Sequence, residues 1–502
     1  MEKTVNLSGR VRRVLWAAFL VSLPVTSFPF FPAVLGGKST VRPLAIYPLI
    51  GLFILVMPRL FKIRLPRAFI PLFVFAIAAL ISGGVAMSLG IPVFNGITVL
   101  DRVIRNFMTL AIGIGFYLLV ALIPEDQEEL RFTLRWLFIG FAVALLWGSL
   151  QAVYVVLPNS PTMRAFFDQL NELHHLISTR NLQRRRVSGM AYEPSWFAEQ
   201  LCILLLPWLL TSVFRRHSVF PWRFRGVQGE DLMLVWAVGV LILTYSRGGV
   251  VILFALLGLS FMGWRAKKRM GAPRSWVSLL KRASLAGGVM VVLGTLIFVL
   301  GSQNQYFSRL WRFWTEDEGG RNYWAYIAFG QRFIYWEAAL DIFEQHPVFG
   351  VGMGNYALVF EDALPEVPLY RYPEILRLIV PEKGREVLLT PKNLFVRVLS
   401  ETGLVGFAFF VGFLWVVLGE GMSLWLSDDK EQGFWGRAGV LGFVAACLVG
   451  FSTDSFATPN MWVLFGLVTA ASRIFSDYGP VAEGQASVSG NGVRTRISPV
   501  EG

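Results

Sequence analysis

The sequence contains few charged residues, few histidines and almost no cysteine. Asp, Glu, Lys and Arg make up 16% of its 502 residues, whereas hydrophobic residues make up 55%. Soluble domains contain about 25% charged residues, so this composition excludes an ordinary soluble protein. The two cysteines, Cys202 and Cys447, lie in apolar segments and are interpreted as small core residues rather than as a disulfide. The adjacent His174 and His175 diverge on a helix, so they do not predict a metal site.

Long apolar runs between charged residues and Gly or Pro predict membrane helices. A helix needs roughly 20 residues to cross a bilayer. The predicted spans lie near residues 14–35, 43–57, 69–89, 103–123, 135–157, 195–214, 232–246, 248–264, 284–301, 394–418, 436–454 and 459–475. The predicted fold class is therefore all-α, a polytopic membrane protein of about twelve transmembrane helices with a large extracytoplasmic loop subdomain.

Basic residues predict the orientation of the chain. The N-terminus and alternate loops are rich in lysine or arginine, and the positive-inside rule makes that side cytoplasmic. The net charge of +13 therefore does not require a nucleic acid as partner. The predicted parts are a cytoplasmic N-terminus (1–13), nine transmembrane helices (14–301) with a short outer loop (158–194), a large extracytoplasmic loop (302–391), three further helices (392–475) and a disordered cytoplasmic tail (476–502).

The first outer segment and the start of the second carry arginine without lysine. The residues are Arg164, Arg180, Arg184, Arg185, Arg186, Arg309, Arg312, Arg321 and Arg332. The planar guanidinium group binds phosphate through two parallel hydrogen bonds and stays charged when it is partly desolvated. This set indicates an anionic ligand on the outer face, with phosphate or pyrophosphate as the natural candidate. Contact with anionic lipid headgroups, or ion pairs with local acids such as Asp168, is the alternative.

Two further candidates lie beside predicted helix starts. Arg247 precedes Gly248 and Gly249, which allow a close backbone approach, and the following helix offers free N–H groups to an anion. A tight helical hairpin with a snorkelling arginine is the alternative. Glu193 precedes Pro194, which suits the first turn of a helix, so its carboxylate is a candidate general base. A helix-capping acid paired with one of the arginines 184–186 is the alternative.

The long outer segment is rich in aromatic residues, among them Tyr335 and Trp336. Anchoring at the membrane interface is their usual role, and stacking on sugar rings is a second. The spacing of apolar residues from Arg332 to Phe343 predicts a helix. The glycine-rich residues 350–356 lack the preceding strand and the Lys-Ser/Thr of a nucleotide loop, so they predict a tight turn.

Four motifs, in this order along the chain, resemble the O-antigen ligase and polymerase superfamily. They are Arg186-Val187-Ser188-Gly189 with Glu193-Pro194-Ser195-Trp196-Phe197-Ala198, Ser246-Arg247-Gly248-Gly249, Arg332 to Trp336 with Ala339, His346-Pro347 and Gly350 to Tyr356, and Asn393-Leu394-Phe395 with Leu399, Glu401, Gly403, Leu404 and Gly406. They cover roughly residues 180–410, around one large outer loop.

The resemblance implies a type C glycosyltransferase fold in the bacterial cytoplasmic membrane, with the active site facing outward. It implies an inverting enzyme without metal or cofactor that uses polyprenyl-diphosphate-linked oligosaccharides. Arg186, Arg247 and Arg332 would then hold the diphosphate and stabilise the charge on the leaving group. Besides membrane lipids, a flippase and a chain-length regulator are candidate partners, and nucleic acid is not.

These considerations give a set of candidate site residues. The candidate catalytic residues are Glu193, Arg247 and Arg332. The candidate diphosphate- and glycan-binding residues are Arg184, Arg185, Arg186, Tyr335, Trp336, Lys392 and Asn393.

Lys392 stands where the ligases of this superfamily commonly have a histidine. A lysine is a poor base near neutral pH unless burial lowers its pKa strongly, although it binds phosphate as a point charge. The sequence therefore favours a polymerase of lipid-linked repeat units for O-antigen, capsule or exopolysaccharide. A ligase that transfers the glycan to a lipid A core is the alternative. A transporter or flippase is a second alternative, because twelve spans with cytoplasmic termini are a common transporter plan.

Overall fold

The computed structural model describes most of the chain. The described residues are 7–31, 40–60, 65–94, 96–157, 160–220, 222–263, 276–304, 330–366 and 388–477, with residues 308, 372 and 375. Arg309, Arg312 and Arg321 lie outside these ranges, as do much of the predicted loop 302–391 and most of the predicted tail 476–502.

The described residues are mostly helical, and a helix overlaps each of the twelve predicted spans. The helices are α1 (Leu7–Ser22), α2 (Ile46–Leu60), α3 (Phe69–Ala86), α4 (Val99–Leu122), α5 (Gln127–Val156), α6 (Pro161–His174), α7 (Pro194–Gln200), η2 (Leu201–Leu205), α8 (Leu206–Arg215), α9 (Gly229–Leu243), α10 (Arg247–Gly263), α11 (Trp276–Gln303), α14 (Gly330–Gln345), α15 (Tyr356–Val359), α17 (Leu394–Leu426), α18 (Lys430–Gly450) and α19 (Pro459–Asp477). The helix predicted from Arg332 to Phe343 is present as part of α14.

One short hairpin is the only sheet in the described part of the chain. Strands β1 (Arg223–Phe224) and β2 (Val227–Gln228) pair in antiparallel fashion. The two residues of the turn, Arg225 and Gly226, both have positive φ, at 49° and 83°. A two-residue turn with two positive φ angles matches the right-handed twist of a hairpin.

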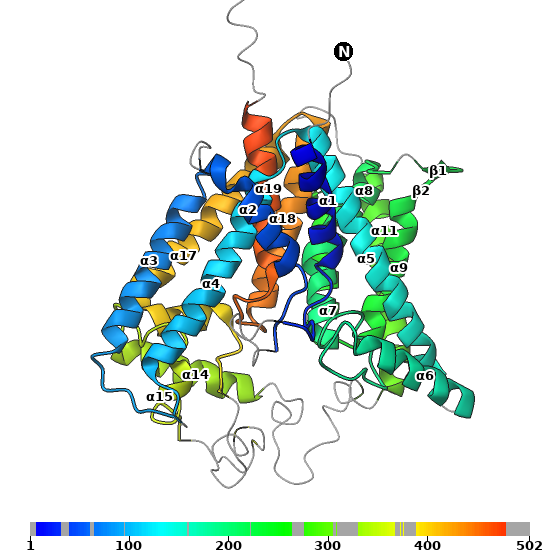
Figure 1. The fold of residues 1–502 in the computed structure, drawn as a ribbon. Coiled ribbons are helices and arrows are strands. Elements are labelled where there is room, and N and C mark those ends of the chain that lie inside the picture. Colours follow the sequence, from blue (N-terminus) through cyan, green and yellow to red (C-terminus); the bar gives the residue numbers. More distant parts are fainter. Residues whose placement is uncertain are drawn as a thin grey trace, which may run out of the picture.

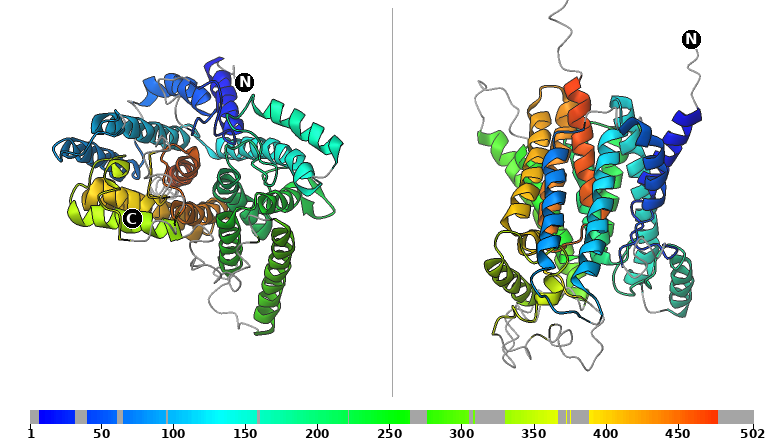
Figure 2. Two further views of the ribbon diagram at one scale, coloured as in Figure 1. Left: turned by 90° about the horizontal axis from the view of Figure 1, so that it is seen from below. Right: turned by 60° about the vertical axis from the view of Figure 1, so that its left-hand side comes forward.

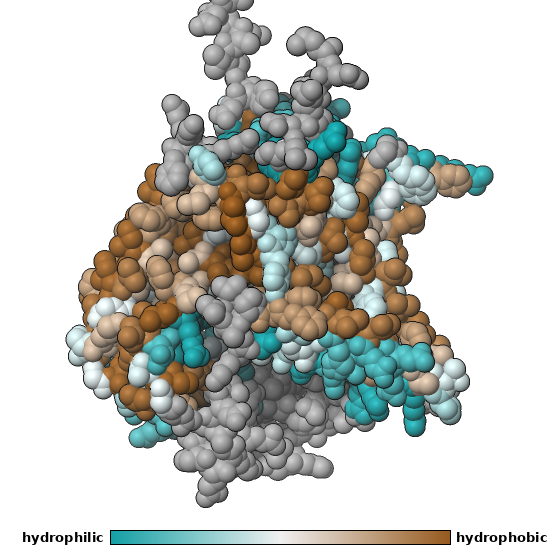
Figure 3. All heavy atoms as spheres, viewed as in Figure 1, coloured by the Kyte–Doolittle hydropathy of each residue, from teal (hydrophilic) through white to brown (hydrophobic). Residues whose placement is uncertain are grey.

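Six helical segments within the described residues are long and apolar enough to cross a membrane. They are Phe69–Ala86, Val99–Leu122, Gln127–Val156, Pro194–Arg215, Leu394–Leu426 and Lys430–Gly450. Shorter apolar helices lie at Ile46–Pro58, Arg247–Phe261 and Met290–Gln303. An apolar band crosses the middle of the molecule, with hydrophilic residues toward both ends (Figure 3). These features confirm an all-α, polytopic membrane protein.

The helices form a bundle with two distinct ends (Figure 1). The start of α1 and the end of α19 lie at the same end, called here the terminal end. Helices α6, α14 and α15 lie at the opposite end, called here the loop end. Helices α3, α4 and α17 stand on one side and α5, α9 and α11 on the other, with α18 and α19 between them (Figure 2). Helix α17 packs along both α3 and α18, and α4 packs along α19.

A fully buried π-helical turn, η2, joins α7 to α8. All five of its residues, Leu201–Leu205, are buried. Pro207 follows two residues later, and its ring would clash with the carbonyl of Ile203 in a regular α-helix. The wider π turn accommodates this proline inside the membrane core, where a broken helix would leave backbone groups unpaired.

Candidate active site at the loop end

The connection between α18 and α19 holds two other helices together. The Ser452 carbonyl accepts a hydrogen bond from Arg332 Nη1 of α14 at 3.2 Å. The next residue, Thr453, donates from Oγ1 to Glu199 of α7 at 2.7 Å. Glu199 also interacts electrostatically with Arg332 and with Glu193. Two of the predicted catalytic residues, Arg332 and Glu193, therefore lie in the same region of the loop end.

Asp454, the next residue of this connection, holds the start of α17. Its Oδ2 accepts the backbone N–H of Lys392 at 2.8 Å. Lys392 itself has a positive φ of 51°, which a non-glycine residue seldom adopts, and this hydrogen bond stabilises that conformation. The Lys392 ammonium lies 5.2 Å from the centre of the Tyr335 ring, within the range of a cation–π contact. Two of the predicted binding residues, Lys392 and Tyr335, thus lie next to each other.

Asn393 caps α17. Its Oδ1 accepts the backbone N–H groups of Phe395 and Val396 at 3.0 and 3.2 Å, and the side chain is only 1% exposed. These bonds satisfy two of the N–H groups that a helix start leaves unpaired. Asn393 is thus the N-cap of α17, directly after Lys392.

Arg186 is fixed on the turn that carries Arg247. Its Nε donates to the Thr244 carbonyl at 2.9 Å, and its Nη2 lies 3.5 Å from the Tyr245 carbonyl. Arg247 is the first residue of α10, so it lies where the helix dipole favours an anion. Ser246 Oγ accepts the N–H of Gly249 at 3.3 Å within this first turn. The structure thus places Arg186 and Arg247 at one turn.

Helix α7 contacts elements that carry or bind both groups of arginines. A side chain added at Gly249, in the first turn of α10, would come within 2.9 Å of Ala198 Cβ in α7. The neighbouring Glu199 of α7 contacts Thr453, beside Arg332. The start of α10, which carries Arg247, and the α18–α19 connection, which binds Arg332, therefore both contact α7, and Glu193 precedes that helix.

Residues 232–411 match the family model of O-antigen ligase. The match runs from α9 into α17, so it contains Arg247, Arg332, Lys392 and Asn393. It confirms the predicted resemblance to the O-antigen ligase and polymerase superfamily. In general terms, this supports a membrane glycosyltransferase of the ligase and polymerase type. No curated protein matches the chain.

Outside the O-antigen ligase match, Glu193 forms an ion pair. Its partner is Arg180, not one of the arginines 184–186 that the alternative interpretation names. The Glu193 side chain is 38% exposed and makes no side-chain capping bond to α7. The Arg180 guanidinium also stacks 4.9 Å from the Tyr192 ring. Glu193 is thus accessible at the loop end, and Arg180 partly compensates its charge.

Arg184 and Arg185 stand apart from Arg186. Arg184 is 67% exposed and lies 3.8 Å from Asp168, which is itself 65% exposed. Arg185 is exposed, and its carbonyl accepts a hydrogen bond from Asn304 at 2.9 Å. For Arg184, the pairing with a local acid that the sequence leaves open is present.

The two predicted aromatic residues differ in burial. The Tyr335 ring is fully buried, so it packs within the protein, with the Phe360 ring 5.7 Å away. Burial raises the pKa of Tyr356 well above its usual value, and the nearby Tyr335, Asp454 and Glu401 raise it further. Tyr356 therefore remains protonated and donates to the Tyr335 carbonyl at 2.8 Å. Only Trp336, which is partly buried, has surface for contact with a sugar ring.

A buried arginine of the O-antigen ligase match was missing from the predicted site. Arg397 is 5% exposed and donates from Nε to Glu401 at 3.0 Å, from Nη1 to the Asp454 carbonyl at 2.7 Å and from Nη2 to Asn106 at 2.7 Å. It ties α17 to α4 and to the α18–α19 connection. The sequence signal for it was the four-residue spacing of Arg397 and Glu401 on one helix face.

The glycine-rich loop forms turns that dock on a kink in α17. The helix is broken at Gly403, where φ is 62° and ψ is −168°. The N–H groups of Val351 and Gly352 donate to the carbonyls of Ser400 and Glu401 at 3.1 and 2.9 Å. These bonds use acceptors that the kink would otherwise leave unpaired. The loop is therefore built for contact with α17 rather than for cradling a phosphate.

No three His, Cys, Asp or Glu side chains in the described ranges gather closely enough to hold a metal ion. Cys202 and Cys447 are both free thiols, and Cys202 is buried. Their interpretation as packed residues rather than a disulfide pair agrees with these positions.

Proposed function

We propose that this chain polymerises polyprenyl-diphosphate-linked oligosaccharide repeat units at the outer face of the bacterial cytoplasmic membrane. The observation that carries the proposal is the arrangement around α7. Arg247, on the turn that also holds Arg186, begins α10, which packs on α7 at Ala198, and Arg332 bonds to the α18–α19 connection, which contacts α7 at Glu199. Arg332 belongs to α14, which lies at the loop end, opposite the start of α1 and the end of α19 (Figure 1).

In this proposal the arginines bind the diphosphate that leaves the donor sugar. The bond from the anomeric carbon to the diphosphate oxygen breaks, and negative charge accumulates on the leaving group. Arg186, Arg247 and Arg332 stabilise that charge, and the start of α10 adds the partial positive charge of its N–H groups. Positioned cations thereby perform the electrostatic work for which other glycosyltransferases use a metal.

The acceptor hydroxyl attacks the anomeric carbon from the opposite face, so the configuration inverts. Glu193 is positioned to accept the hydroxyl proton, because it is accessible at the start of α7. Arg180 holds the carboxylate in place without burying it. We assign Glu193 as the general base of the proposed reaction.

Lys392 favours polymerisation over ligation. Its ammonium lies over the Tyr335 ring, and its backbone is fixed by Asp454. A cation in this position serves as a point charge for phosphate rather than as a base. The description of the matching family favours the ligase alternative, in which the acceptor is a lipid A core.

The acceptor requirement separates these two functions. Full-length protein in nanodiscs is supplied with lipid-linked repeat units alone, and the products are resolved on a gel. A ladder of glycans supports polymerisation. Product formation only after a lipid A core is added shows ligation instead.

The arginine assignment is tested by Arg247→Ala in the same assay. Loss of one transition-state donor lowers the rate by about 10² to 10³-fold. Arg105→Ala is the matched control, because Arg105 is an exposed arginine near the loop-end start of α4. If Arg247→Ala and Arg105→Ala polymerise equally well at equal expression, Arg247 does not bind the diphosphate.

A further inference from the structure

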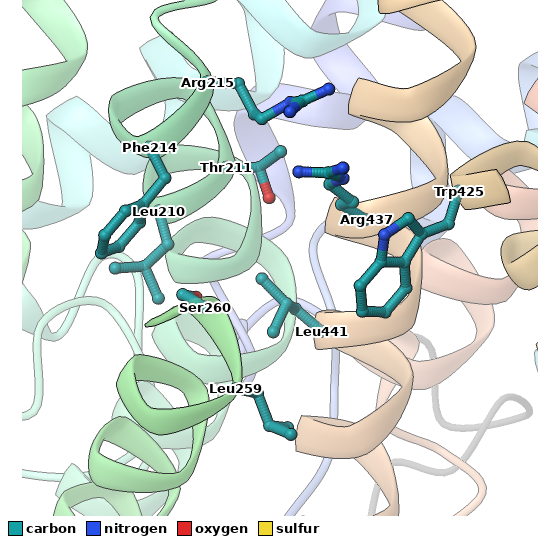
Figure 4. A pocket seen from close by; sticks show the side chains of 9 residues that line it. All are labelled: Leu210, Thr211, Phe214, Arg215, Leu259, Ser260, Trp425, Arg437 and Leu441. Carbon is teal, nitrogen blue, oxygen red and sulfur yellow. The ribbon is translucent and has the colours of Figure 1, made fainter. Parts of the chain in front are cut away.

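A small cavity lies near the terminal end, between α8, α10, α17 and α18 (Figure 4). Its volume of about 30 Å³ leaves room for about two water-sized groups. Two arginines, Arg215 and Arg437, line it together with Trp425, Thr211 and Ser260, and the rest of the wall is apolar. None of these residues belongs to the candidate active site, which lies at the loop end.

Arg437 is a buried cation in this wall. Its side chain is only 6% exposed, and its Nε and Nη2 have no hydrogen-bond partner. An arginine cannot lose its charge in a protein, and a buried charge without a partner is costly. The Trp425 ring, 5.8 Å from the guanidinium carbon, offers a cation–π contact but no hydrogen-bond acceptor. Arg437 therefore has donors available for a ligand in the cavity.

Arg215 adds a second positive charge rather than a compensating negative one. Figure 4 shows the two guanidinium groups reaching toward each other across the cavity, beside Thr211. Within the described part of the chain, no carboxylate lies within ion-pair distance of either arginine. Two like charges that face each other repel, and an oxyanion held between them would turn this repulsion into attraction.

The two hydroxyl groups that line the cavity already donate hydrogen bonds to backbone carbonyls. Thr211 donates to the Pro207 carbonyl and Ser260 to the Leu256 carbonyl, each at 2.7 Å. The donors left for a ligand are thus those of the arginines and the indole N–H of Trp425. Planar guanidinium groups bind the oxygens of a phosphate group in pairs, which gives the cavity a preference for that class of anion.

The arginines line the part of the cavity nearest the terminal end, and apolar residues line the part nearer the middle of the bundle (Figure 4). Arg215 is the last residue of α8, and Arg437 lies in the second turn of α18, near the terminal end. Leu441, one turn further along α18, extends the wall toward the middle of the bundle. An oxyanion at the arginines fits this order, either as free phosphate or as a lipid headgroup whose apolar chain lies outside the small cavity.

We propose that Arg215 and Arg437 form a binding site for a phosphate-class oxyanion at the terminal end of the bundle, carried by a lipid headgroup or free in solution. The bound anion bridges α8 and α18 and compensates the charge of Arg437. This site is separate from the proposed active site, so its test does not depend on glycan synthesis.

Thermal unfolding of the delipidated full-length protein in detergent tests the proposal. Three probes are titrated at constant ionic strength: phosphatidylglycerol, phosphatidylcholine and inorganic phosphate. A saturable rise in Tm with phosphatidylglycerol, larger than with phosphatidylcholine, assigns the anion to a lipid. A rise of equal size with inorganic phosphate alone assigns it to the free ion.

Two charge-removing variants and a matched control give the specificity. Arg437→Gln and Arg215→Gln are expected to raise the half-saturating concentration at least about tenfold, because each removes charge-assisted hydrogen bonds. Arg225→Gln changes the net charge equally, at the exposed tip of the β1–β2 hairpin, and is expected to bind as the wild type does. Equal titrations for the wild type and both cavity variants would overturn the proposal.

Arg437→Met separates a ligand site from a purely structural arginine. If the cavity needs an anion, replacing the unpaired charge with an apolar side chain raises the Tm of the ligand-free protein and abolishes the rise caused by the ligand. A ligand-free Tm below that of the wild type, together with an unchanged rise on adding the ligand, would show that Arg437 serves the fold alone.

Discussion

The arginines in two regions of the loop end differ in burial and in hydrogen bonding. At the start of α17, Arg397 is buried and bonded at all three guanidinium nitrogens to Glu401, Asp454 and Asn106. In the α6 region, Arg184 is exposed and only loosely paired with an acid. The start of α17, with the buried network of Arg397, is called here the platform. The exposed α6 region around Arg184 is called the rim. An arginine in these segments therefore serves the fold in one region and the solvated surface in the other, so its presence in the sequence does not by itself identify a phosphate site.

The sharpest test of the platform is Arg397→Ala. The change leaves the buried Glu401 carboxylate without its partner, so the expected loss of stability is about 3–5 kcal/mol. It is measured as a fall in Tm and in the yield of folded protein, with Arg105→Ala as the matched control. A Tm equal to that of the control would mean that the buried network does not stabilise α17.

Gly350→Ala tests the docking of the glycine loop on the same platform. Gly350 has a φ of 66°, and an added Cβ would lie 2.5 Å from the Ser400 carbonyl oxygen. The left-handed conformation and the backbone clash together are expected to cost about 2–4 kcal/mol. Gly90→Ala shares the positive φ, at 65°, but meets no atom within 4 Å. A similar fall in Tm for both variants would show that the loss of stability comes from the backbone conformation and not from the clash with α17.

In the α6 region, His174 predicts a dependence on pH. Burial lowers its pKa to about 4, and the adjacent His175 adds to this effect. The unfolded chain binds a proton near pH 6.5, so the stabilisation is complete above that value and is lost as the pH falls toward 4. The expected loss at pH 5 is about 2 kcal/mol.

Hydrogen exchange of α6, corrected for the intrinsic effect of pH, measures this loss. Protonation also removes the acceptor for Trp147 Nε1, which donates to His174 Nδ1 at 3.2 Å. His174→Phe is expected to flatten the pH dependence. If exchange in the wild type is equally independent of pH, His174 does not titrate within the α5–α6 contact.

The smallest effect is expected for Arg184→Ala. Exposed ion pairs contribute little, so stability should change by less than about 0.5 kcal/mol and glycan synthesis by less than about twofold. The polymerisation assay and Tm measure both. A loss as large as that expected for Arg247→Ala would place Arg184 in the active site and remove the distinction between platform and rim.

The sequence was sufficient to predict the helices because membrane helices have a simple signal. Runs of apolar residues and their bounding charges locate α3, α4, α5 and α18 without knowledge of their packing. The helix from Arg332 was also predictable, because its apolar residues repeat with helical spacing. The family resemblance implied that Arg186, Arg247 and Arg332 act together, and the hydrogen bonds of Arg186 to the α9–α10 turn place it beside the residue that begins α10, Arg247.

The contacts that join the site were beyond sequence reasoning. Ser452 and Thr453 act through one backbone carbonyl and one hydroxyl, and neither group distinguishes these residues from others in a loop. The kink at Gly403 lies within an apolar run whose pattern predicts a continuous helix. The burial of Arg397 depends on three partners far apart in the chain, so only the fold reveals it.

The π turn η2 sets the rotational phase of the helix that precedes it. Each residue in an α-helix advances the helix by about 100° around its axis, so one residue added or removed turns everything beyond it by that angle. Deleting one residue within Leu201–Leu205 would remove the extra residue of this turn and swing Glu199 away from Thr453. The same rotation would carry Glu193 out of alignment with the arginines, while α8 kept its place at the terminal end. A turn buried in the membrane core thus sets the direction in which Glu193 and Glu199 face at the loop end.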